Sequence, residues 1–290
     1  MLLRRAGALL CVVQPQSGRR GVPSCSLHME PIGHIQTIFS TRFGTPRQGC
    51  LAPAARARLP LDGSAMGSLS AVQTVEGIEE YSHLWLLWGF HKNDHAASNP
   101  KVRPPRLRGE RTGLFATRSP YRPNPIGLSL VKLEGVENTT LLLSGADLLD
   151  GTPVYDVKPF VPYCDSPYDP SIRGDEQGDV YGAAWVSDER ALRVSISPEA
   201  TAQLAEMLPH LPARGLFGSV SELRDAITQC LQADPRPLYR WRRQKQAAGA
   251  GEYSLVLGGV SIRCRFEADD ASVTVLSLGN GGSSDGQDLD

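Results

Sequence analysis

Residues 113–166 concentrate polar side chains that prolines and glycines hold in place. Proline fixes φ, and glycine reaches backbone conformations that other residues avoid. A loop rich in both therefore holds its side chains in set directions, which suits a binding site better than a connecting segment. The side chains concerned are those of Arg118, Arg122, Asn124 and Asp150. Because arginines bind phosphates and carboxylates, the chemistry indicated is binding of a nucleic acid or a charged cofactor.

Basic residues gather in two clusters, although the formal net charge of the chain is only −1. Such clusters can bind phosphates whatever the overall charge. A solvated face is the alternative, but prolines surround the first cluster and the Arg118 loop adjoins it, which favours a nucleic-acid or cofactor role. The first cluster contains Lys101, Arg103, Arg106, Arg108, Arg111, Arg118 and Arg122, and the second contains Arg236, Arg240, Arg242, Arg243 and Lys245.

A set of long motifs, rich in rare residues, carries a family resemblance. They are residues 30–35 (EPIGHI), 45–48 (TPRQ), 81–85 (YSHLW), 90–92 (FHK), 102–107 (VRPPRL), 115–119 (FATRS), 122–127 (RPNPIG), 150–153 (DGTP), 156–159 (DVKP) and 234–240 (DPRPLYR). Together they resemble the TsaA-like proteins, and within them the TrmO-type tRNA (adenine-N6)-methyltransferases. The resemblance covers roughly residues 30–278.

This resemblance implies a small β-barrel that binds S-adenosylmethionine, usually within a homodimer. It implies methylation at N6 of N6-threonylcarbamoyladenosine, at position 37 of a threonine tRNA, next to the anticodon. The cofactor contacts carried over from the family fall on Pro46, Arg47, Gln48, His91, Lys92, Arg118, Leu128, Ser144, Gly145, Ala146 and Asp147. Structural ion pairs for the arginines, and core positions for His91 and Leu128, are the alternatives.

Methyl transfer from a sulfonium donor is mostly a matter of positioning, but the acceptor nitrogen must lose a proton. The residues predicted to help as base or electrostatic partner are Asp147, Asp150 and Lys158, with Asp156 as a further candidate. The sequence does not choose among them. Asp150 precedes Gly151 and is equally well explained as a turn aspartate.

Other functions are indicated less well. No strand leads into a G-x-G-x-x-G loop, so a Rossmann methyltransferase is disfavoured. A hydrolase would need a nucleophile–base pair, and the G-x-S-x-G match at residues 282–286 lies in a low-complexity tail. The main alternative is a module that binds S-adenosylmethionine or RNA without turnover. The six cysteines are scattered and form no C-x-x-C, and His91 and His95 lack a carboxylate partner, so no metal is predicted.

The expected fold is mainly β, with a cofactor-binding β-barrel followed by a small α+β domain. The expected boundaries are an N-terminal extension at 1–28, the barrel at 29–168, a linker at 169–189, the α+β domain at 190–278 and a disordered tail at 279–290. In the barrel, strands are expected at 30–39, 84–90, 126–133, 139–143 and 154–157, turns at 135–138 and 150–151, a helical turn at 75–80, and irregular chain at 44–67 and 93–113.

The C-terminal pattern predicts two helices and three strands. Serines at 197 and 219 are expected helix caps, because each precedes an apolar periodic run. Strands are expected at 252–257, 260–266 and 272–278, and Gly258-Gly259 predicts a tight hairpin between the first two.

Residues 1–28 contain four arginines and no acid, which is typical of a mitochondrial transit peptide. A secretory signal, with Asn138 as a glycosylation acceptor, and an incidental extension before a start at Met29 are the other interpretations. The apolar run at 6–13 is far shorter than the about 20 residues of a membrane span. The predicted location is cytoplasmic, with the mitochondrion as alternative, and no membrane segment is expected.

Overall fold

The computed structural model describes residues 29–67, 69–93, 99–107, 109–166, 191–211, 215–237, 239–242, 251–267 and 271–281. The predictions for the extension at 1–28, the linker at 169–189 and the tail at 282–290 lie outside these ranges. The tail was expected from residue 279, but the last strand continues to Asn280, because residues 279 and 280 pair with the strand before it. No helix in the described ranges is long and apolar enough to span a bilayer.

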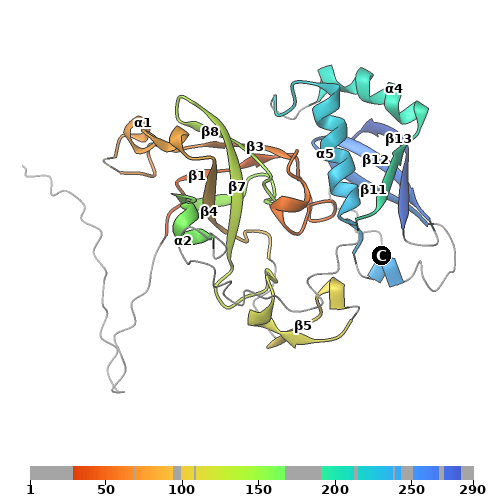
Figure 1. Cartoon of the computed structure of the whole chain (residues 1–290), viewed down its shortest axis with the longest axis horizontal. Coiled ribbons are helices and arrows are strands. Elements are labelled where there is room, and N and C mark those ends of the chain that lie inside the picture. Colours follow the sequence, from red (N-terminus) through yellow and green to blue (C-terminus); the bar gives the residue numbers. More distant parts are fainter. Residues whose placement is uncertain are drawn as a thin grey trace, which may run out of the picture. The chain divides into compact units, whose positions relative to one another are not determined.

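The larger sheet contains seven strands in the order β1-β9-β4-β7-β8-β3-β2 (Figure 1), and every neighbouring pair is antiparallel. Its strands are β1 (Gly33–His34), β2 (Gln36–Thr37), β3 (Arg56–Pro60), β4 (His83–Gly89), β7 (Ile126–Glu137), β8 (Thr140–Ser144) and β9 (Pro153–Pro159).

The sheet closes through its first two strands. β1 and β2 are the two end strands of this order: β1 pairs with β9, and β2 pairs with β3. Along the chain, however, only Ile35 separates β1 from β2. A bridge between Gly33 and Leu61 completes the seam. The predicted mainly-β barrel is therefore confirmed.

The barrel strands alternate buried and exposed residues, as expected for strands that cover an apolar interior. In β4 the inward side chains of Leu84, Leu86 and Trp88 are buried, while Trp85 and Leu87 face outward. The interior is completed by Ile35, Ala57, Leu59, Val131, Leu133, Leu141, Leu143, Ala146, Leu148 and Val154.

Two expectations for the barrel are wrong. β3 lies inside residues 44–67, which were expected to be irregular. Its two arginines form ion pairs with β7: Arg56 with Glu134, and Arg58 with Glu137. These charges therefore belong to a strand and not to a loop. β7 also continues to Glu137, through most of the turn expected at 135–138. Gly135 marks a shift of register within the strand, as glycine does at a β-bulge, and the turn begins at Asn138, which has φ of 58°.

Short elements connect the barrel strands. They are η1 (Gly49–Leu51), α1 (Ala71–Thr74), η2 (Ile78–Glu80), η3 (Pro105–Leu107), η4 (Leu114–Ala116), α2 (Pro162–Asp165) and a two-stranded sheet of β5 (Lys101–Val102) and β6 (Thr112–Gly113). The stretch expected to be irregular at 93–113 thus contains a small sheet.

The C-terminal sheet has the order β10-β13-β12-β11 (Figure 1), from β10 (Arg193–Ile196), β11 (Gly251–Leu257), β12 (Val260–Phe266) and β13 (Ser272–Asn280). The Gly258-Gly259 hairpin is confirmed. β10 was not expected. It pairs in parallel with β13, which follows it by almost 80 residues, and its four residues are too few to show a period.

Both predicted helix starts are confirmed. α4 (Pro198–Met207) begins after Ser197, whose side chain accepts a hydrogen bond from the Ala200 N–H. α5 (Val220–Gln232) begins after Ser219, which accepts from the Glu222 N–H. Leu223, Ile227 and Leu231 form the buried face of α5, and a 3-10 turn, η6 (Leu208–His210), follows α4.

The C-terminal core also contains Ile38, Phe39, Ala52 and Ala55 from the barrel segment between β2 and β3. At one end of this segment Gly258 donates its N–H to the carbonyl of Ile38, at 2.6 Å. At the other end Ala54 donates its N–H to Oε1 of Gln229, at 2.7 Å. The chain that carries residues 46–48 is therefore fastened on both sides by C-terminal residues.

Candidate functional site

Arg118 and Gln48, both predicted cofactor residues, contact each other directly. Nη1 of Arg118 donates a hydrogen bond to Oε1 of Gln48. The loop that carries Arg118 is braced from within, because Arg122 donates from Nη1 to the Thr117 carbonyl at 2.9 Å. Thr117 in turn donates from its hydroxyl to the Leu114 carbonyl at 2.8 Å. This agrees with the set conformation inferred from its prolines.

Asp147 lies beside this pair. Its Oδ1 accepts a hydrogen bond from the Ser129 hydroxyl at 2.5 Å, and its carboxylate also accepts from the N–H of Gly49. Burial raises the pKa of Asp147. The Ser129 hydrogen bond, the charge of Arg118 and the Gly49 N–H act in the opposite direction but do not outweigh the burial.

The two backbone segments of the predicted cofactor set touch. A Cβ on Gly49 would lie 1.9 Å from the carbonyl oxygen of Gly145, so only glycine permits this approach. Gly145, with φ of 70°, donates its N–H to Ala55. Ser144 turns its hydroxyl toward Glu134 at 2.6 Å, so the main chain of 144–147, with Asp147, is what this segment presents to the site.

Leu128 lies on the outside of β7 with 57% of its surface exposed, so the core alternative for this residue is wrong. His91 is partly covered, with Nδ1 3.3 Å from the hydroxyl of Thr152. Burial, then the charges of Lys92 and His34, lower the pKa of His91. Lys92 donates from Nζ to the Ser40 carbonyl at 3.2 Å.

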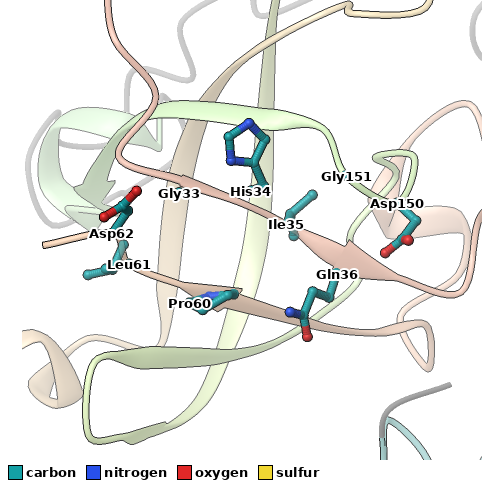
Figure 2. Close-up of a pocket in the computed structure, with 9 residues that line it drawn as sticks. All are labelled: Gly33, His34, Ile35, Gln36, Pro60, Leu61, Asp62, Asp150 and Gly151. Atoms are coloured by element: carbon teal, nitrogen blue, oxygen red, sulfur yellow. The ribbon is translucent and has the colours of Figure 1, made fainter. Parts of the chain in front are cut away.

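A separate cavity of about 470 Å³ contains Asp150. Figure 2 shows Asp150 at one end and Asp62 at the other, with His34 and Gln36 between them. Oδ1 of Asp150 accepts a hydrogen bond from the N–H of Thr37 at 3.0 Å. The main-chain N–H of Asp150 donates to the carbonyl of Phe39. Asp150 therefore links β2 and the residues after it to the turn at 150–151. Neither Arg118 nor Asp147 lines this cavity.

Lys158 lies on the outer surface of β9, with its side chain 72% exposed. Its Nζ is 2.9 Å from Oδ2 of Asp156. The three predicted catalytic residues therefore have different partners: Asp147 is bound by Ser129 and Gly49, Asp150 by Thr37, and Lys158 by Asp156.

Pro46 and Arg47 line a second cavity, of about 250 Å³, together with Cys230 and residues 233–237. In this cavity Arg236 is 3% exposed and forms two hydrogen bonds of 2.8 Å to the carboxylate of Asp234. Its guanidinium carbon also lies 3.9 Å from the centre of the Phe266 ring. The charge of Asp234 attracts Arg47, whereas that of Arg106 repels it.

The sequence did not reveal three residues that support the predicted site: Gly49 and Ser129 contact Asp147, and Trp88 contacts Ser129. One signal was available. Ser129 occupies an inward position of β7, where the alternation of the strand otherwise places Val131 and Leu133. Within the described ranges no group of three or more His, Cys, Asp or Glu side chains is placed to hold a metal ion.

Relatives define the class of protein that has this barrel and site. The chain is 40% identical over 254 residues to a putative S-adenosylmethionine-dependent methyltransferase, RcsF, of Pseudomonas aeruginosa. The match covers 87% of this chain and 98% of that protein. It is 36% identical over 258 residues to the tRNA (adenine(37)-N6)-methyltransferase of Escherichia coli K12, with the same shares. A mouse protein of the latter name is 46% identical over 150 residues, but the match spans 52% of this chain and only 34% of that protein. The class is that of S-adenosylmethionine-dependent methyltransferases.

Family models narrow the class. The model described as the tRNA-methyltransferase O N-terminal domain matches residues 34–166, and the TrmO C-terminal domain model matches residues 189–279. A crystal structure of TrmO from Pseudomonas aeruginosa superposes with a TM-score of 0.64 at 32% identity, over 88% of this chain and 98% of that one. The chain belongs to the TrmO family of tRNA methyltransferases.

Proposed function

We propose that this protein transfers a methyl group from S-adenosylmethionine to N6 of N6-threonylcarbamoyladenosine at position 37 of a tRNA, next to the anticodon. The observation that carries the proposal is the cluster of Arg118, Gln48 and Asp147, which joins the two loops and the strand end that the family resemblance assigns to the cofactor. A threonine tRNA is the proposed substrate.

The side chains of this cluster fit the chemistry of S-adenosylmethionine. That molecule combines a carboxylate with an ammonium and a sulfonium group, so it needs both a cationic and an anionic partner. Arg118 is the cationic group and Asp147 the anionic one, and the exposed Leu128 offers an apolar surface. In the proposal, Pro46, Arg47, His91, Lys92 and the main chain of 144–147 complete the contacts.

When bound, S-adenosylmethionine supplies a methyl group that its sulfonium has already activated. The work left to the protein is to orient the acceptor and to remove the N6 proton, which the adjacent carbamoyl group makes more acidic. Of the predicted catalytic residues, Asp147 is the one we propose as base or electrostatic partner, because it lies with Arg118 and Gln48. Asp150 and Lys158 are better explained by their bonds to Thr37 and Asp156.

The tRNA surface we propose combines the two basic clusters. Gly109, with φ of 105°, lies against Arg242, because a Cβ on Gly109 would be 1.8 Å from Nη2 of that arginine. Arg106 of the first cluster also acts electrostatically on Arg47 of the cofactor set. The two basic clusters thus meet at Gly109 and Arg242, and Arg106 lies near Arg47, which gives tRNA phosphates cationic partners from both.

The homodimer that the family resemblance implies is part of the proposal. Phe115 is 77% exposed and Ile126 and Leu128 are exposed on the outside of the barrel, as apolar side chains are at subunit interfaces. Phe115→Ser is expected to increase the monomer fraction in light scattering, whereas Leu69→Ser, at a similarly exposed leucine, is not. Equal monomer fractions for both variants and the wild type would contradict the dimer through this face.

The test of the proposed function is a methyl-transfer assay with the full chain, labelled S-adenosylmethionine, and tRNA from cells with and without threonylcarbamoyladenosine. Nucleoside analysis should find the label in N6-methylated threonylcarbamoyladenosine, and none on the unmodified tRNA. Binding of S-adenosylmethionine in calorimetry without any transfer to either tRNA would refute the proposed reaction and favour a binding module.

A further inference from the structure

Ser129 is a polar residue on the inward side of β7. Its strand neighbours Gly127 and Val131 also point inward, whereas Leu128 points outward. Ser129 is only 6% exposed. A hydroxyl in such a position costs free energy unless it finds hydrogen-bond partners, so its partners show why a serine is placed there.

Ser129 links Trp88 to Asp147. Nε1 of Trp88 lies 3.1 Å from the Ser129 hydroxyl oxygen, and that oxygen lies 2.5 Å from Oδ1 of Asp147. An indole N–H can only donate, so the hydroxyl oxygen accepts from Trp88 and its own proton is left for Asp147. The direction of the chain of hydrogen bonds is therefore set, from Trp88 to Ser129 to Asp147.

The indole of Trp88 is itself held in place. Trp88 pairs with Gly127 across β4 and β7, and a Cβ on Gly127 would lie 2.2 Å from Cε2 of the indole. On another side the ring of Phe90 packs edge-on, with centroids 4.3 Å apart. Because the ring packs against Gly127 and Phe90, these contacts help to direct its N–H at Ser129.

We infer that Ser129 and Trp88 are positioning residues for methyl transfer, which orient the carboxylate of Asp147 beside Arg118. The inference rests on the proposed function, because it assigns Asp147 to the reaction. Asp147 is held from two sides: Ser129 donates from the barrel interior, and the Gly49 N–H donates from the segment that follows Gln48. Neither Ser129 nor Trp88 needs to touch a substrate for this role.

The role has a measurable consequence. Hydrogen bonds to an ionised carboxylate favour the charged form, and the Ser129 hydroxyl opposes the effect of burial on the pKa of Asp147. Without that hydroxyl the pKa of Asp147 should rise further, and more of the protein should carry a protonated, inactive carboxyl at mildly acidic pH.

The first experiment titrates Asp147 in the full chain by carbon-13 NMR of labelled aspartates, with Asp147→Asn to assign the signal. Ser129→Ala should raise the apparent pKa of Asp147. Ser129→Thr, which keeps the hydroxyl, should restore it, and Trp88→Phe, which removes the indole N–H together with the five-membered ring, should give an intermediate value. An unchanged titration in Ser129→Ala would overturn the inference, whether or not the protein methylates tRNA.

The second experiment measures kcat/KM for methyl transfer as a function of pH. Ser129→Ala should move the acidic limb to higher pH and lower the rate there by about tenfold, in keeping with loss of one hydrogen bond to a charged group. At high pH the rate should recover, whereas a merely structural defect would lower it at every pH. A shifted titration with an unshifted rate profile would refute the positioning role.

Failure of the proposed function is distinguishable from failure of this inference. If the wild type transfers no methyl group, the dissociation constant for S-adenosylmethionine replaces the rate. Ser129→Ala should then weaken binding more at acidic than at alkaline pH. A dissociation constant that stays equal to that of the wild type at all pH values would overturn the inference.

Discussion

Arg118 donates a hydrogen bond to the side-chain oxygen of Gln48, which lies 70 positions earlier in the chain. One residue belongs to the proline-rich loop after η4, and the other precedes η1 between β2 and β3. Neither loop contains a feature that specifies the other as its partner. The closed barrel brings them together, and Asp147 at the end of β8 joins them.

Substitution of Arg118 separates a cofactor role from a structural one. Arg118→Met removes the cationic group and the bond to Gln48. We expect the affinity for S-adenosylmethionine to fall roughly 10- to 100-fold, as for loss of a hydrogen bond to a charged group, with little change in melting temperature. Calorimetry measures the affinity. Arg103→Met, at an exposed position of the first basic cluster, is the control and should bind as the wild type does. A normal affinity for Arg118→Met with a much lower melting temperature would mean a structural ion pair.

Gly127 should tolerate no side chain. Gly127→Ala places a Cβ 2.2 Å from Trp88 Cε2, so β7 or the indole must move. Overpacking of this kind lowers the free energy of unfolding by about 1–3 kcal/mol, which urea denaturation can measure. Gly135→Ala is a matched control in the same strand, because the nearest atom to its Cβ would be 4.0 Å away. Similar losses in the two variants would show that the Trp88 contact is not the cause.

The Asp234–Arg236 pair should contribute more to stability than an exposed pair of the same kind. Asp234→Asn tolerates the positive φ of 47° but removes the carboxylate from the buried Arg236. Loss of one partner of a buried pair costs about 3 kcal/mol, so the midpoint of urea unfolding should fall clearly. Glu252→Gln disrupts the exposed pair with Arg265 and should change the free energy of unfolding by less than about 0.5 kcal/mol. Equal effects would contradict this ranking.

Stability should depend on pH in opposite directions at two carboxylates. Burial raises the pKa of Asp147, so between its ordinary pKa and the raised one the folded state binds more protons, and stability falls as pH rises. The hydrogen bond from Ser144, followed by Lys132 and Arg56, lowers the pKa of Glu134, so its contribution is present above the ordinary pKa and is lost as pH falls. Relative to the wild type, Asp147→Asn should therefore gain stability as pH rises, and Glu134→Gln should lose it. Urea titrations from about pH 3 to 7 give the two slopes, and slopes of the same sign would contradict this assignment.

The cysteines should differ in reactivity. Burial raises the pKa of Cys230 to about 12, and burial also raises that of Cys264 to about 12, so neither forms thiolate near neutral pH. Cys50 and Cys164 are exposed. Brief alkylation of the native protein at neutral pH should therefore label Cys50 and Cys164 and spare Cys230 and Cys264, as mass spectrometry of peptides can show. Labelling in urea is the control for complete accessibility, and native labelling of Cys230 would contradict its burial in α5.

Local signals predicted the C-terminal elements well. Serine caps and a Gly-Gly pair act over three or four residues, so Ser197, Ser219 and the β11–β12 turn could be located without knowledge of the rest. β3 was missed because its character depends on distant residues: Glu137 pairs with Arg58 from 79 positions away. β10 was missed because β13, its partner in the described sheet, is also remote in sequence.

The proline- and glycine-rich pattern pointed to Arg118 and Asp150, and the family resemblance added Gln48 and Asp147 as cofactor contacts. The fold brings Gln48, Arg118 and Asp147 together, whereas Asp150 and Lys158, predicted from the need to remove a proton, form other contacts. The role of Ser129 could not be predicted from the sequence, because a single serine in an apolar strand has many explanations. Only its two partners, Trp88 and Asp147, distinguish a hydrogen-bond relay from a chance polar residue.

The seam of the barrel also has a consequence for synthesis on the ribosome. Residues 33–37 are synthesised early, but their hydrogen bonds to the chain at and before β9 can form only later. The N–H of Thr37, for example, bonds to Asp150, which is 113 positions further on. At about 5–20 residues per second, that is roughly 6–23 s during which the nascent strand has an unpaired edge. In the finished barrel β9 and β3 cover this edge. The interval in which residues 33–37 are vulnerable therefore falls during translation, and slowing or pausing the ribosome between codons 37 and 150 would lengthen it.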